Sequence, residues 1–539
     1  MIRNLFLILG AVTLLAGCSG KAAAPPCPQG KVCLHIGNTT DPLTLDPAKS
    51  TGTWEDRIES DVLMGLTQSA PDGSPIPGMA ESWETSADGL TWTFHLRKAL
   101  WSDGVPVTAN DFVFALRRLL DPATASEYAS NMYAIKNAEA VNNGKLPLTA
   151  LGVEAPDPHT LIIRLNHPAA YLLELAKHHT MYAVPEHVVA KWGDKWVKPE
   201  HFVGNGPYVL KAWRLGDYVQ IVKNPRFFDA DKVCVDEIYY YPTTDAISAE
   251  RQVAQGELDI NTDIQSNRIS LLRQKMPDYV HTHTYLGLVY LAFNRSEKSG
   301  YPPFADKRVR LALSMAIDRD FIANKLLRGG QQPAFLFVPP GTANYASPPL
   351  PEWAGWSFEK RQAEARRLLK EAGYGPGHPL KLEIKHRNTA DPMLFMPSIQ
   401  ADWKAIGVEA TLAQEEAQIA YADYRARSYQ VADAAWIGDY NDPMTFLFLQ
   451  RSNTGSQNYG DYKNPAYDAL LDRADQTVDP KARAAILAKA ETMMLADAPV
   501  VPIYYYINKN LVNPKVTGFV DNIVDQHRAR WMCVKPAAK

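Results

Sequence analysis

The sequence has little net charge and, beyond its first 15 residues, no long apolar run. Its 56 basic and 59 acidic residues give a formal net charge of −3, with no long stretch of either sign, which argues against nucleic acid as the partner. No later segment reaches the roughly 18 consecutive apolar residues of a membrane-spanning helix. With 46% hydrophobic and 21% charged residues among 539, the chain is typical of a soluble globular protein. It is too long for one core, so two or three domains are expected.

Motifs that would mark an enzyme or a metal site are also missing. The sequence contains neither HExxH nor GxSxG. The glycine-rich turn at 203–208 has Val209 where a phosphate-binding loop needs its third glycine, and the acidic run that starts at 439 has Met444 where a calcium loop needs glycine. The pair His178 and His179 lacks ligand spacing and is expected on the surface. We therefore expect no enzyme, no metal and no cofactor.

The N-terminus has the features of a bacterial lipoprotein signal. Arg3 precedes a short apolar run at 5–15, and the small residues Ala16 and Gly17 stand directly before Cys18. This pattern predicts a signal peptide at 1–17, cleavage before Cys18 and acylation of that cysteine. Residues 18–30 then form a lipid-tethered linker, in which Ser19 does not signal retention at the inner membrane. The expected location is the periplasm of a Gram-negative bacterium, anchored to the membrane by lipid.

Only four other cysteines are present: Cys27, Cys33, Cys234 and Cys533. In an oxidising compartment they allow three disulfide pairings. Cys27 and Cys33 are close enough in sequence to close a small loop, and Cys234 would then join Cys533. A zinc site built from all four is the alternative, although the cysteines lack zinc-ligand spacing.

A strand-like stretch at 431–443 draws attention to one carboxylate. Its apolar first half is typical of a buried strand, and its Asp/Asn/Pro end is typical of a turn. Asp439 lies where the strand opens into the turn, three residues after Trp436. A buried carboxylate is costly unless a cation meets it, and the stretch contains no Lys or Arg. We expect a ligand ammonium to supply that cation. The alternative is that Asp439 only caps a helix at 444–449.

The order of elements indicates an α/β fold. Trp92, Phe94 and Leu96 alternate with polar residues as in a strand, and Thr108 with Asp111 forms a helix-start signal. The longest amphipathic helix is expected at 306–327. Short strands alternating with helices imply α/β lobes.

A series of motifs then identifies a family. In order along the chain stand LDP at 45–47, PGMAESW at 77–83, WTFHLR at 92–97, WSDG at 101–104, VTANDF at 107–112, GELD at 256–259, RVRLA at 308–312, AIDR at 316–319 and WIGDYNDP at 436–443. Two longer runs, at 121–130 and 501–508, match especially well. The chain resembles the periplasmic oligopeptide-binding proteins of ABC importers, in the peptide/nickel family 5 of solute-binding proteins, along nearly its whole mature length.

The resemblance implies a two-lobed, flytrap-like α/β fold with an extra inserted subdomain. Lobe I would comprise residues 31–63, 190–290 and 507–539, the inserted subdomain 64–189, and lobe II 291–506. The implied function is to capture oligopeptides between the lobes as a monomer and deliver them to an ABC permease and its ATPase in the inner membrane. Alternatives are the same fold binding a murein peptide or a non-peptide ligand such as a metal chelate, haem, a sugar or an opine, or a tethered sensor without transport.

The resemblance also assigns residues to the site. Asp439 falls on the acidic anchor for the peptide α-ammonium, and Trp436 on a pocket aromatic. Main-chain contacts with the peptide are implied for Ala435, Ile437 and, on the opposite lobe, Thr53. Pocket tyrosines are implied at Tyr128 and Tyr506, of which Tyr506 could equally pack in the core.

Departures from the family pattern gather at the far end of the site. Asp433 stands where a tripeptide-binding member has an arginine that meets the ligand carboxylate, and Met393 where the family has a histidine. Glu416 falls near a pocket tryptophan, and Gly287 and Ile437 replace a pair of cysteines. Arg425 or Arg427 could supply a cation there, or both could be solvated surface residues. We expect an altered ligand length or C-terminal preference, with cell-wall peptides as one possibility.

Overall fold

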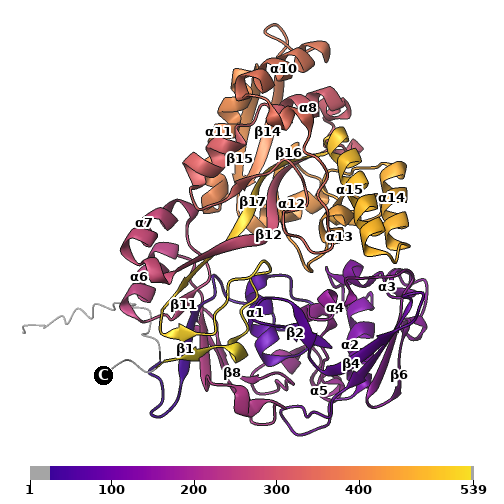
Figure 1. The fold of residues 1–539 in the computed structure, drawn as a ribbon, viewed down its shortest axis with the longest axis vertical. Coiled ribbons are helices and arrows are strands. Elements are labelled where there is room, and N and C mark those ends of the chain that lie inside the picture. Colours follow the sequence, from indigo (N-terminus) through magenta and orange to yellow (C-terminus); the bar gives the residue numbers. More distant parts are fainter. Residues whose placement is uncertain (1–24, 536–539) are drawn as a thin grey trace, which may run out of the picture.

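The computed structural model describes residues 25–535, and the predicted signal peptide and lipidated Cys18 lie outside this range. Within it, no helix has both the length and the apolar character needed to cross a membrane. The fold is the mixed α/β architecture expected from the sequence. Figure 1 shows a tapering upper part, which corresponds to lobe II, above a wider lower part that holds lobe I and the inserted subdomain.

An 11-stranded sheet connects the two lobes, in the order β15-β14-β16-β12-β17-β11-β1-β10-β9-β8, with β13 added beside β17. The strands are β1 (Cys33–Gly37), β8 (Tyr208–Arg214), β9 (Tyr218–Lys223), β10 (Glu237–Tyr241), β11 (Ile260–Asn261), β12 (Val280–Phe293), β13 (Gln332–Pro333), β14 (Leu380–Arg387), β15 (Val408–Glu415), β16 (Val431–Ile437) and β17 (Val500–Val512). The pairings β1·β10, β1·β11, β14·β15 and β14·β16 are parallel. Parallel strands joined through helices are typical of α/β lobes.

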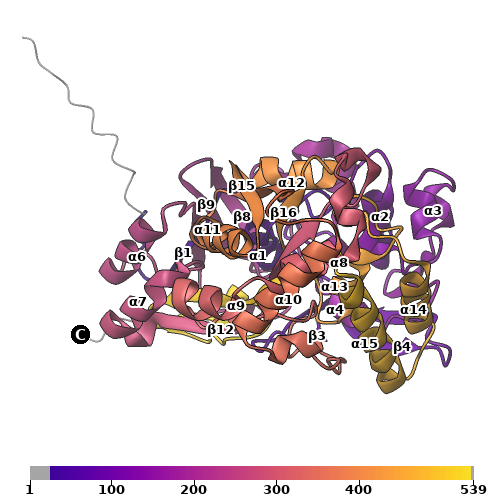
Figure 2. The ribbon, with the colours of Figure 1, turned by 90° about the horizontal axis from the view of Figure 1, so that it is seen from above.

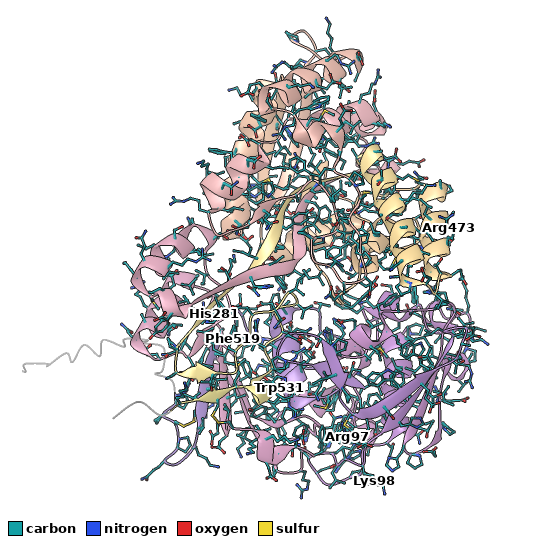
Figure 3. The ribbon with its side chains drawn as sticks, viewed as in Figure 1. Arg97, Lys98, His281, Arg473, Phe519 and Trp531 are labelled. Carbon is teal, nitrogen blue, oxygen red and sulfur yellow. A yellow bond between two sulfur atoms is a disulfide. The ribbon has the colours of Figure 1, made fainter. Side chains whose placement is uncertain are left out.

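Two long antiparallel strands, β12 and β17, run from one lobe into the other (Figure 1). The second half of β12 is buried on both faces, whereas its first half is only partly covered. Near that first half, His281 packs edge-on against Phe519 of the C-terminal segment, with ring centroids 5.1 Å apart (Figure 3). The ladder between β12 and β17 is interrupted between Thr284 and Leu288. Such an irregularity is a natural point for the two lobes to bend relative to one another.

Helices cover the sheet in both lobes. Lobe I carries α1 (Thr53–Val62), α6 (Ala246–Gln255) and α7 (Ile269–Lys275). Lobe II carries α8 (Lys307–Met315), α9 (Arg319–Phe321), α10 (Phe358–Glu371), α11 (Ala390–Ala405), α12 (Ala417–Ala426), α13 (Met444–Leu447), α14 (Pro465–Asp475) and α15 (Pro480–Asp497). Seen from above, α14 and α15 lie on the same side of the molecule as the inserted subdomain (Figure 2).

The inserted range 64–189 builds its own sheet, in the order β4-β5-β7-β6. Its elements are β2 (Thr67–Ser69), β3 (Pro75–Pro77), β4 (Ala80–Thr85), β5 (Thr91–Leu96), β6 (Val153–Asp157), β7 (Thr160–Arg164), α2 (Ala109–Leu120), α3 (Ala138–Asn142) and α4 (Leu172–Leu175), and α5 (Glu186–Trp192) crosses its end. The capping signal at the start of α2 forms as expected, because the Thr108 amide donates to Asp111 Oδ2 at 2.8 Å. The residue boundaries of the three parts stay a prediction.

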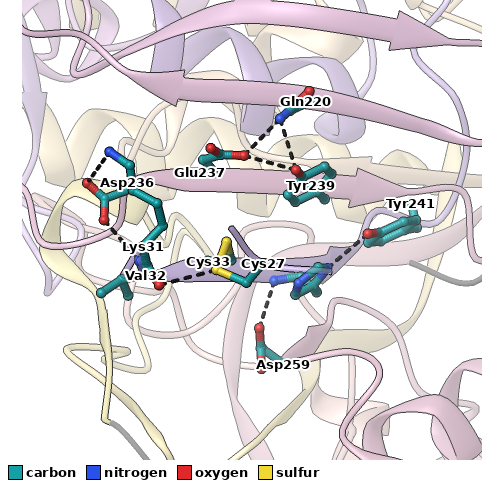
Figure 4. The surroundings of a disulfide bond; sticks show 11 residues. Cys27, Lys31, Val32, Cys33, Gln220, Asp236, Glu237, Tyr239, Tyr241 and Asp259 are labelled. Carbon is teal, nitrogen blue, oxygen red and sulfur yellow. Dashed lines mark hydrogen bonds and ion pairs between the residues drawn. A yellow bond between two sulfur atoms is a disulfide. The ribbon is translucent and has the colours of Figure 1, made fainter. Parts of the chain in front are cut away.

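The cysteines form two disulfides. Cys27 is joined to Cys33 and Cys234 to Cys533, with Cα atoms 5.7 and 5.3 Å apart. Figure 4 shows the first bridge at the start of β1, where the Val32 amide donates to Asp236 Oδ2 at 2.9 Å. The second ties the short C-terminal pair β18 (Val516–Thr517) and β19 (Cys533–Val534) to the segment before β10. Sulfur atoms bonded in this way are not available to a metal, so the alternative zinc site is not formed.

The expected helix at 306–327 is interrupted. It comprises α8, the short α9 and a π-helical turn at Ile322–Leu327. The reason lies in Arg319, which is buried and donates through Nη1 to the carbonyl of Ser314 at 2.9 Å, so it satisfies the end of α8 from inside. Asp318 then starts the next segment by accepting from the Phe321 amide. Amphipathic periodicity continued through this break and could not reveal it.

Candidate functional site

Strand β16 has a free edge at the residues singled out in the sequence. It pairs along its whole length with β12, which places Ala435 opposite Val289 and Ile437 opposite Gly287. On its other side β14 pairs with it only at Val431 and Ala432. Among the described residues, β16 therefore has a paired neighbour on one side only beyond Ala432. An exposed strand edge of this kind can accept an extended chain through main-chain hydrogen bonds.

Asp439 follows this edge and is half-buried. Asn131 Nδ2 of the inserted subdomain donates to Asp439 Oδ2 at 3.0 Å, and the Asp439 amide donates to Thr445 Oγ1 at 3.2 Å. Among residues 25–535 no Lys or Arg lies within ion-pair distance of this carboxylate. Burial raises the pKa of Asp439 to about 6, against the opposing effects of the Asn131 hydrogen bond and the nearby His179. The group is thus mostly ionised at pH 7 without a fixed cationic partner.

The capping alternative for Asp439 is wrong. The amide of Met444, the first residue of α13, donates to Asp442 Oδ1 at 2.9 Å, so Asp442 performs that task. Asp442 is also held by Arg483 in two hydrogen bonds of 2.7 and 2.8 Å. The two aspartates therefore differ in role, since one is neutralised by a buried arginine and the other is not.

The side chain of Thr445 contacts both Trp436 and Asp439. The indole N–H of Trp436 lies 3.5 Å from Thr445 Oγ1, the oxygen that also accepts from the Asp439 amide. Phe448 meets the indole edge-on, with centroids 5.8 Å apart. Trp436 remains half-buried, so part of its ring is free to contact a ligand.

Tyr128 belongs to the inserted subdomain and packs against two histidines. Its ring centroid is 5.6 Å from that of His178 and 5.7 Å from that of His179. The expectation that these histidines lie on the surface is wrong, because both are buried. His179 Nδ1 lies 3.5 Å from a carboxylate oxygen of Asp56. Burial disfavours the charged form of His179, but Asp56 and the neighbouring Glu59 together raise its pKa.

Thr53 and Tyr506 are placed at the borders of the same region. Thr53 is exposed as the first residue of α1, and the Tyr128 hydroxyl lies 3.5 Å from the carbonyl of Thr51 just before it. Tyr506 is half-buried on β17, and a Cβ at Gly287 would come within 3.0 Å of its ring. Glycine at 287 therefore lets Tyr506 lie directly against β12. Its ring also packs on the lobe II core, so packing and ligand contact are both open to it.

The other end of β16 contains a buried ion pair. Arg387, the last residue of β14, donates through Nε to Asp433 Oδ2 at 2.8 Å and through Nη2 to Oδ1 at 3.1 Å. Arg425 faces Glu127 of the inserted subdomain at 4.0 Å. Arg427 instead pairs with Asp461 at 3.1 Å. The structure thus shows a partner for each arginine at this end.

The structure also places two more departures from the family pattern. The Glu416 side chain starts α12 by accepting from the amides of Gln418 and Ile419. Met393 is exposed on α11. Neither Asn131 nor Arg387 was found from the sequence. Asn131 lies in no charged or glycine-rich motif that would have drawn attention to it. For Arg387 the only indication in the sequence was the short basic run that ends at this residue.

Several contacts join lobe II to the inserted subdomain. Tyr171 stacks on Tyr440 with ring centroids 4.7 Å apart, next to the bond from Asn131 to Asp439. A cavity of about 310 Å³ lies at this junction, and its lining includes Asn131, Tyr171 and Tyr440. Within the described chain, no group of three or more His, Cys, Asp or Glu side chains is arranged to hold a metal ion.

Comparison with known proteins places these features in a family. Residues 74–458 match the model for "Bacterial extracellular solute-binding proteins, family 5 Middle". The periplasmic oligopeptide-binding protein OppA of Escherichia coli K12 is 38% identical over 524 residues, 95% of each chain. The periplasmic murein peptide-binding protein MppA of the same strain is 36% identical over 533 residues, covering 98% of this chain and 97% of MppA.

Solved structures agree. The E. coli murein tripeptide-binding protein MppA superposes with a TM-score of 0.87 at 36% identity, covering 94% of this chain and 99% of the other. Haemophilus influenzae OppA in complex with the peptide RPPGFSPFR gives 0.86 at 33% identity, with the same coverage. The unliganded open form of MppA gives only 0.74 at 36% identity, over 96% and 99%. Family match, identity and fold lead to one conclusion: the chain belongs to the bacterial extracellular solute-binding proteins of family 5.

Proposed function

We propose that this protein captures oligopeptides between its lobes and delivers them to an ABC permease. The observation that carries the proposal is the Asp439 carboxylate, which is half-buried, ionised at neutral pH and without a Lys or Arg partner among the described residues. Its position just beyond the free edge of β16 suits a chain that begins with an α-ammonium. A ligand amine would then supply the cation that a desolvated carboxylate requires.

Main-chain pairing would hold the rest of the peptide. The open edge of β16 at Ala435 and Ile437 offers backbone groups in strand geometry, and the exposed start of α1 at Thr53 would contribute a contact from the other lobe. Hydrogen bonds to a peptide backbone do not depend on its side chains, so many sequences can be accepted. Trp436 and Tyr128, both half-buried, would line side-chain pockets with adaptable aromatic surfaces. Tyr506 and Arg425 complete the proposed set.

Closure of the lobes around the ligand completes the mechanism. Contacts such as Tyr171 with Tyr440 join surfaces that must separate for a peptide to enter. The TM-score to the unliganded open form of MppA is lower than that to the other MppA structure. This difference supports an arrangement in which the two lobes of this protein are together. Opening by a bend in β12 and β17 would expose the edge of β16 to solvent.

The N-terminal motif supports export and anchoring in the periplasm through an acylated Cys18, with binding rather than catalysis as the role. The high similarity to MppA favours one second candidate, a murein peptide, as ligand. Such a peptide also begins with an amino acid residue and can present an ammonium to Asp439. Mass spectrometry of ligands released from freshly purified protein separates the two candidates, because murein peptides contain D-residues and diamino acids.

Calorimetry with a peptide that co-purifies, compared with its N-acetylated form, tests the proposal. Removing the ammonium should weaken binding at least tenfold, because the desolvated Asp439 carboxylate is then left without a cation. Asp439→Asn should bind the free peptide weakly and lose the difference between the two forms. Asp231→Asn, which changes an exposed carboxylate in lobe I, is the matched control and should leave both affinities unchanged. Equal affinity for the free and acetylated peptides would refute the assignment of Asp439.

A further inference from the structure

At the end of β16 away from Asp439, the charge of Asp433 is already neutralised by Arg387 inside the protein. Asp433 is fully buried and Arg387 nearly so, and two hydrogen bonds of 2.8 and 3.1 Å join their side chains. Tyr421 on α12 accepts a third, from Arg387 Nη1 at 3.0 Å. Burial opposes the charge of Arg387, but Asp433 and then Tyr421 and Tyr506 raise the pKa of its guanidinium above the usual value. The pair is therefore a stable ionic unit.

This ion pair belongs to the same strand edge as the proposed peptide contacts. Asp433 precedes Ala435 by two residues on β16, so both side chains point to the same face of the sheet. The pairing between β14 and β16 ends one residue earlier, at Ala432. Arg387 lies at the end of β14, and its guanidinium is close to Tyr421 and Tyr506, which are only half-buried. A peptide lying along β16 away from Asp439 would pass this group.

Other basic groups near this end also have acidic partners. Arg425 faces Glu127 at 4.0 Å. Lys509, on β17 near Tyr506, lies 3.4 Å from Asp263 and 3.6 Å from Asp391. Arg57, on α1 in lobe I, differs: it donates to the amide oxygen of Asn38 and has no carboxylate within ion-pair distance among residues 25–535. Arg387, Arg425 and Lys509 thus all have carboxylate partners, whereas Asp439 has no Lys or Arg partner among the described residues.

We infer that Asp433 determines specificity by occupying Arg387, so that binding depends on the ligand's N-terminal ammonium and is indifferent to its C-terminal carboxylate. The inference rests on the proposed function. A ligand carboxylate gains little from a guanidinium that already has a bidentate partner, and it would be repelled by Asp433. Peptides with an amidated C-terminus, or longer peptides whose C-terminus lies beyond this group, are bound as well as short free acids. Removing the Asp433 charge frees two donors of Arg387 for a ligand carboxylate.

Calorimetry with alanine peptides of three to five residues, each as free acid and as C-terminal amide, tests this inference. The wild type should bind the acid and the amide of each length within about twofold of each other. Asp433→Asn should prefer the acid of at least one length by about tenfold or more, because a charge-assisted pair with Arg387 becomes available. The double variant Asp433→Asn with Arg387→Gln should return to indifference. It removes the buried cation together with its partner, so it shows whether an acid preference of the single variant depends on Arg387.

A matched control uses a similar ion pair away from β16. Asp46 and Arg118 are joined by two hydrogen bonds of 2.6 and 2.7 Å and are similarly covered. Asp46→Asn disrupts that pair and should leave the acid-to-amide ratio unchanged, even where it lowers stability. If Asp433 had only a structural role, Asp433→Asn would likewise leave the acid-to-amide ratio unchanged.

The outcomes separate the possible failures. A wild type that prefers the acid by tenfold, or an Asp433→Asn variant with no gain in acid preference, overturns the inference while peptide binding stands. If Arg57→Gln abolishes an acid preference of the wild type, Arg57 reads the carboxylate and Asp433 does not set specificity. If neither acid nor amide binds at any length, and no peptide co-purifies, the proposed function itself fails and the inference with it.

Discussion

Asn131 Nδ2 lies 3.0 Å from Asp439 Oδ2, and this hydrogen bond joins the inserted subdomain to the loop after β16. The two residues are 308 positions apart in the sequence. A carboxylate oxygen accepts more than one hydrogen bond, so Asn131 can remain in place when a ligand ammonium arrives. The contact therefore both holds the anchor in position and links its geometry to the closed arrangement of the parts.

Replacing Asn131 with alanine should weaken peptide binding by roughly tenfold or more, because one lost hydrogen bond to a charged group typically costs about 1.5–3 kcal/mol. The change removes a donor that holds Asp439 and one of the contacts across the junction. Asn143→Ala, an exposed asparagine of the same subdomain, is the control. Calorimetry that finds the two variants equal in affinity would show that Asn131 does not support the site.

Binding should depend on pH through Asp439. Its pKa is raised to about 6 by burial, and a ligand ammonium requires the ionised form. Affinity is therefore nearly complete well above pH 6, is reduced about twofold near pH 6, and falls by up to about tenfold for each further pH unit. The groups that influence this carboxylate are Asn131, His179, Tyr128 and Asp56. Asn131→Ala should move the midpoint to higher pH, because its hydrogen bond favours the charged form.

The N-acetylated peptide provides the control for the pH experiment. Its weaker binding does not use the charge of Asp439, so its affinity should vary little between pH 7 and pH 5. A parallel fall for the free and acetylated peptides would instead point to a general effect of pH on the fold, since Asp61 and Asp402 also have pKa values raised to about 6 by burial.

The sequence was sufficient for the features that depend on local pattern. Alternation predicted the strand at Trp92, the residue pair Thr108 and Asp111 predicted the start of α2, and the apolar run before Asp439 predicted β16. The family pattern supplied the two-lobed architecture, which periodicity alone does not specify. The features that local pattern predicted share one property: the residues that define them are neighbours in the chain.

Apart from the disulfide between Cys234 and Cys533, features that depend on distant partners could not be predicted. Asn131 and Asp439 meet only because the inserted subdomain folds against lobe II. His178 and His179 were expected on the surface, since no nearby residue indicated that Tyr128 and Asp56 would enclose them. The departure at Asp433 was visible, but its meaning required Arg387 from another strand. A charge in a sequence does not reveal its partner, and the partner decides whether the charge is available to a ligand.

Glu59 should make the fold less stable at alkaline pH. It is fully buried, and its only hydrogen bond, among the described residues, comes from Ser50 at 2.9 Å. Burial, with smaller effects of Asp56 and Glu55, raises its pKa to about 8. The neutral form is favoured in the fold, so its stabilisation is present below the ordinary pKa of a glutamate and is lost as the pH rises through 8. Glu59→Gln should raise the thermal midpoint at pH 8 by a few degrees relative to wild type, and have little effect at pH 5. The exposed Glu257→Gln should change neither.

The two disulfides should contribute unequally to stability. Cys27 and Cys33 are six residues apart, whereas Cys234 and Cys533 are 299 apart. In the chain-entropy view a cross-link restricts the unfolded chain more when its loop is longer, by roughly 2 kcal/mol for the short loop and more than twice that for the long one. Replacing both Cys234 and Cys533 with serine should therefore lower the thermal midpoint clearly more than replacing both Cys27 and Cys33. The two double variants are controls for each other, because each removes one bridge and two sulfur atoms. Calorimetric scans that find equal losses would mean that the long loop is already restricted in the unfolded chain, or that the C-terminal segment opens before the rest of the protein unfolds.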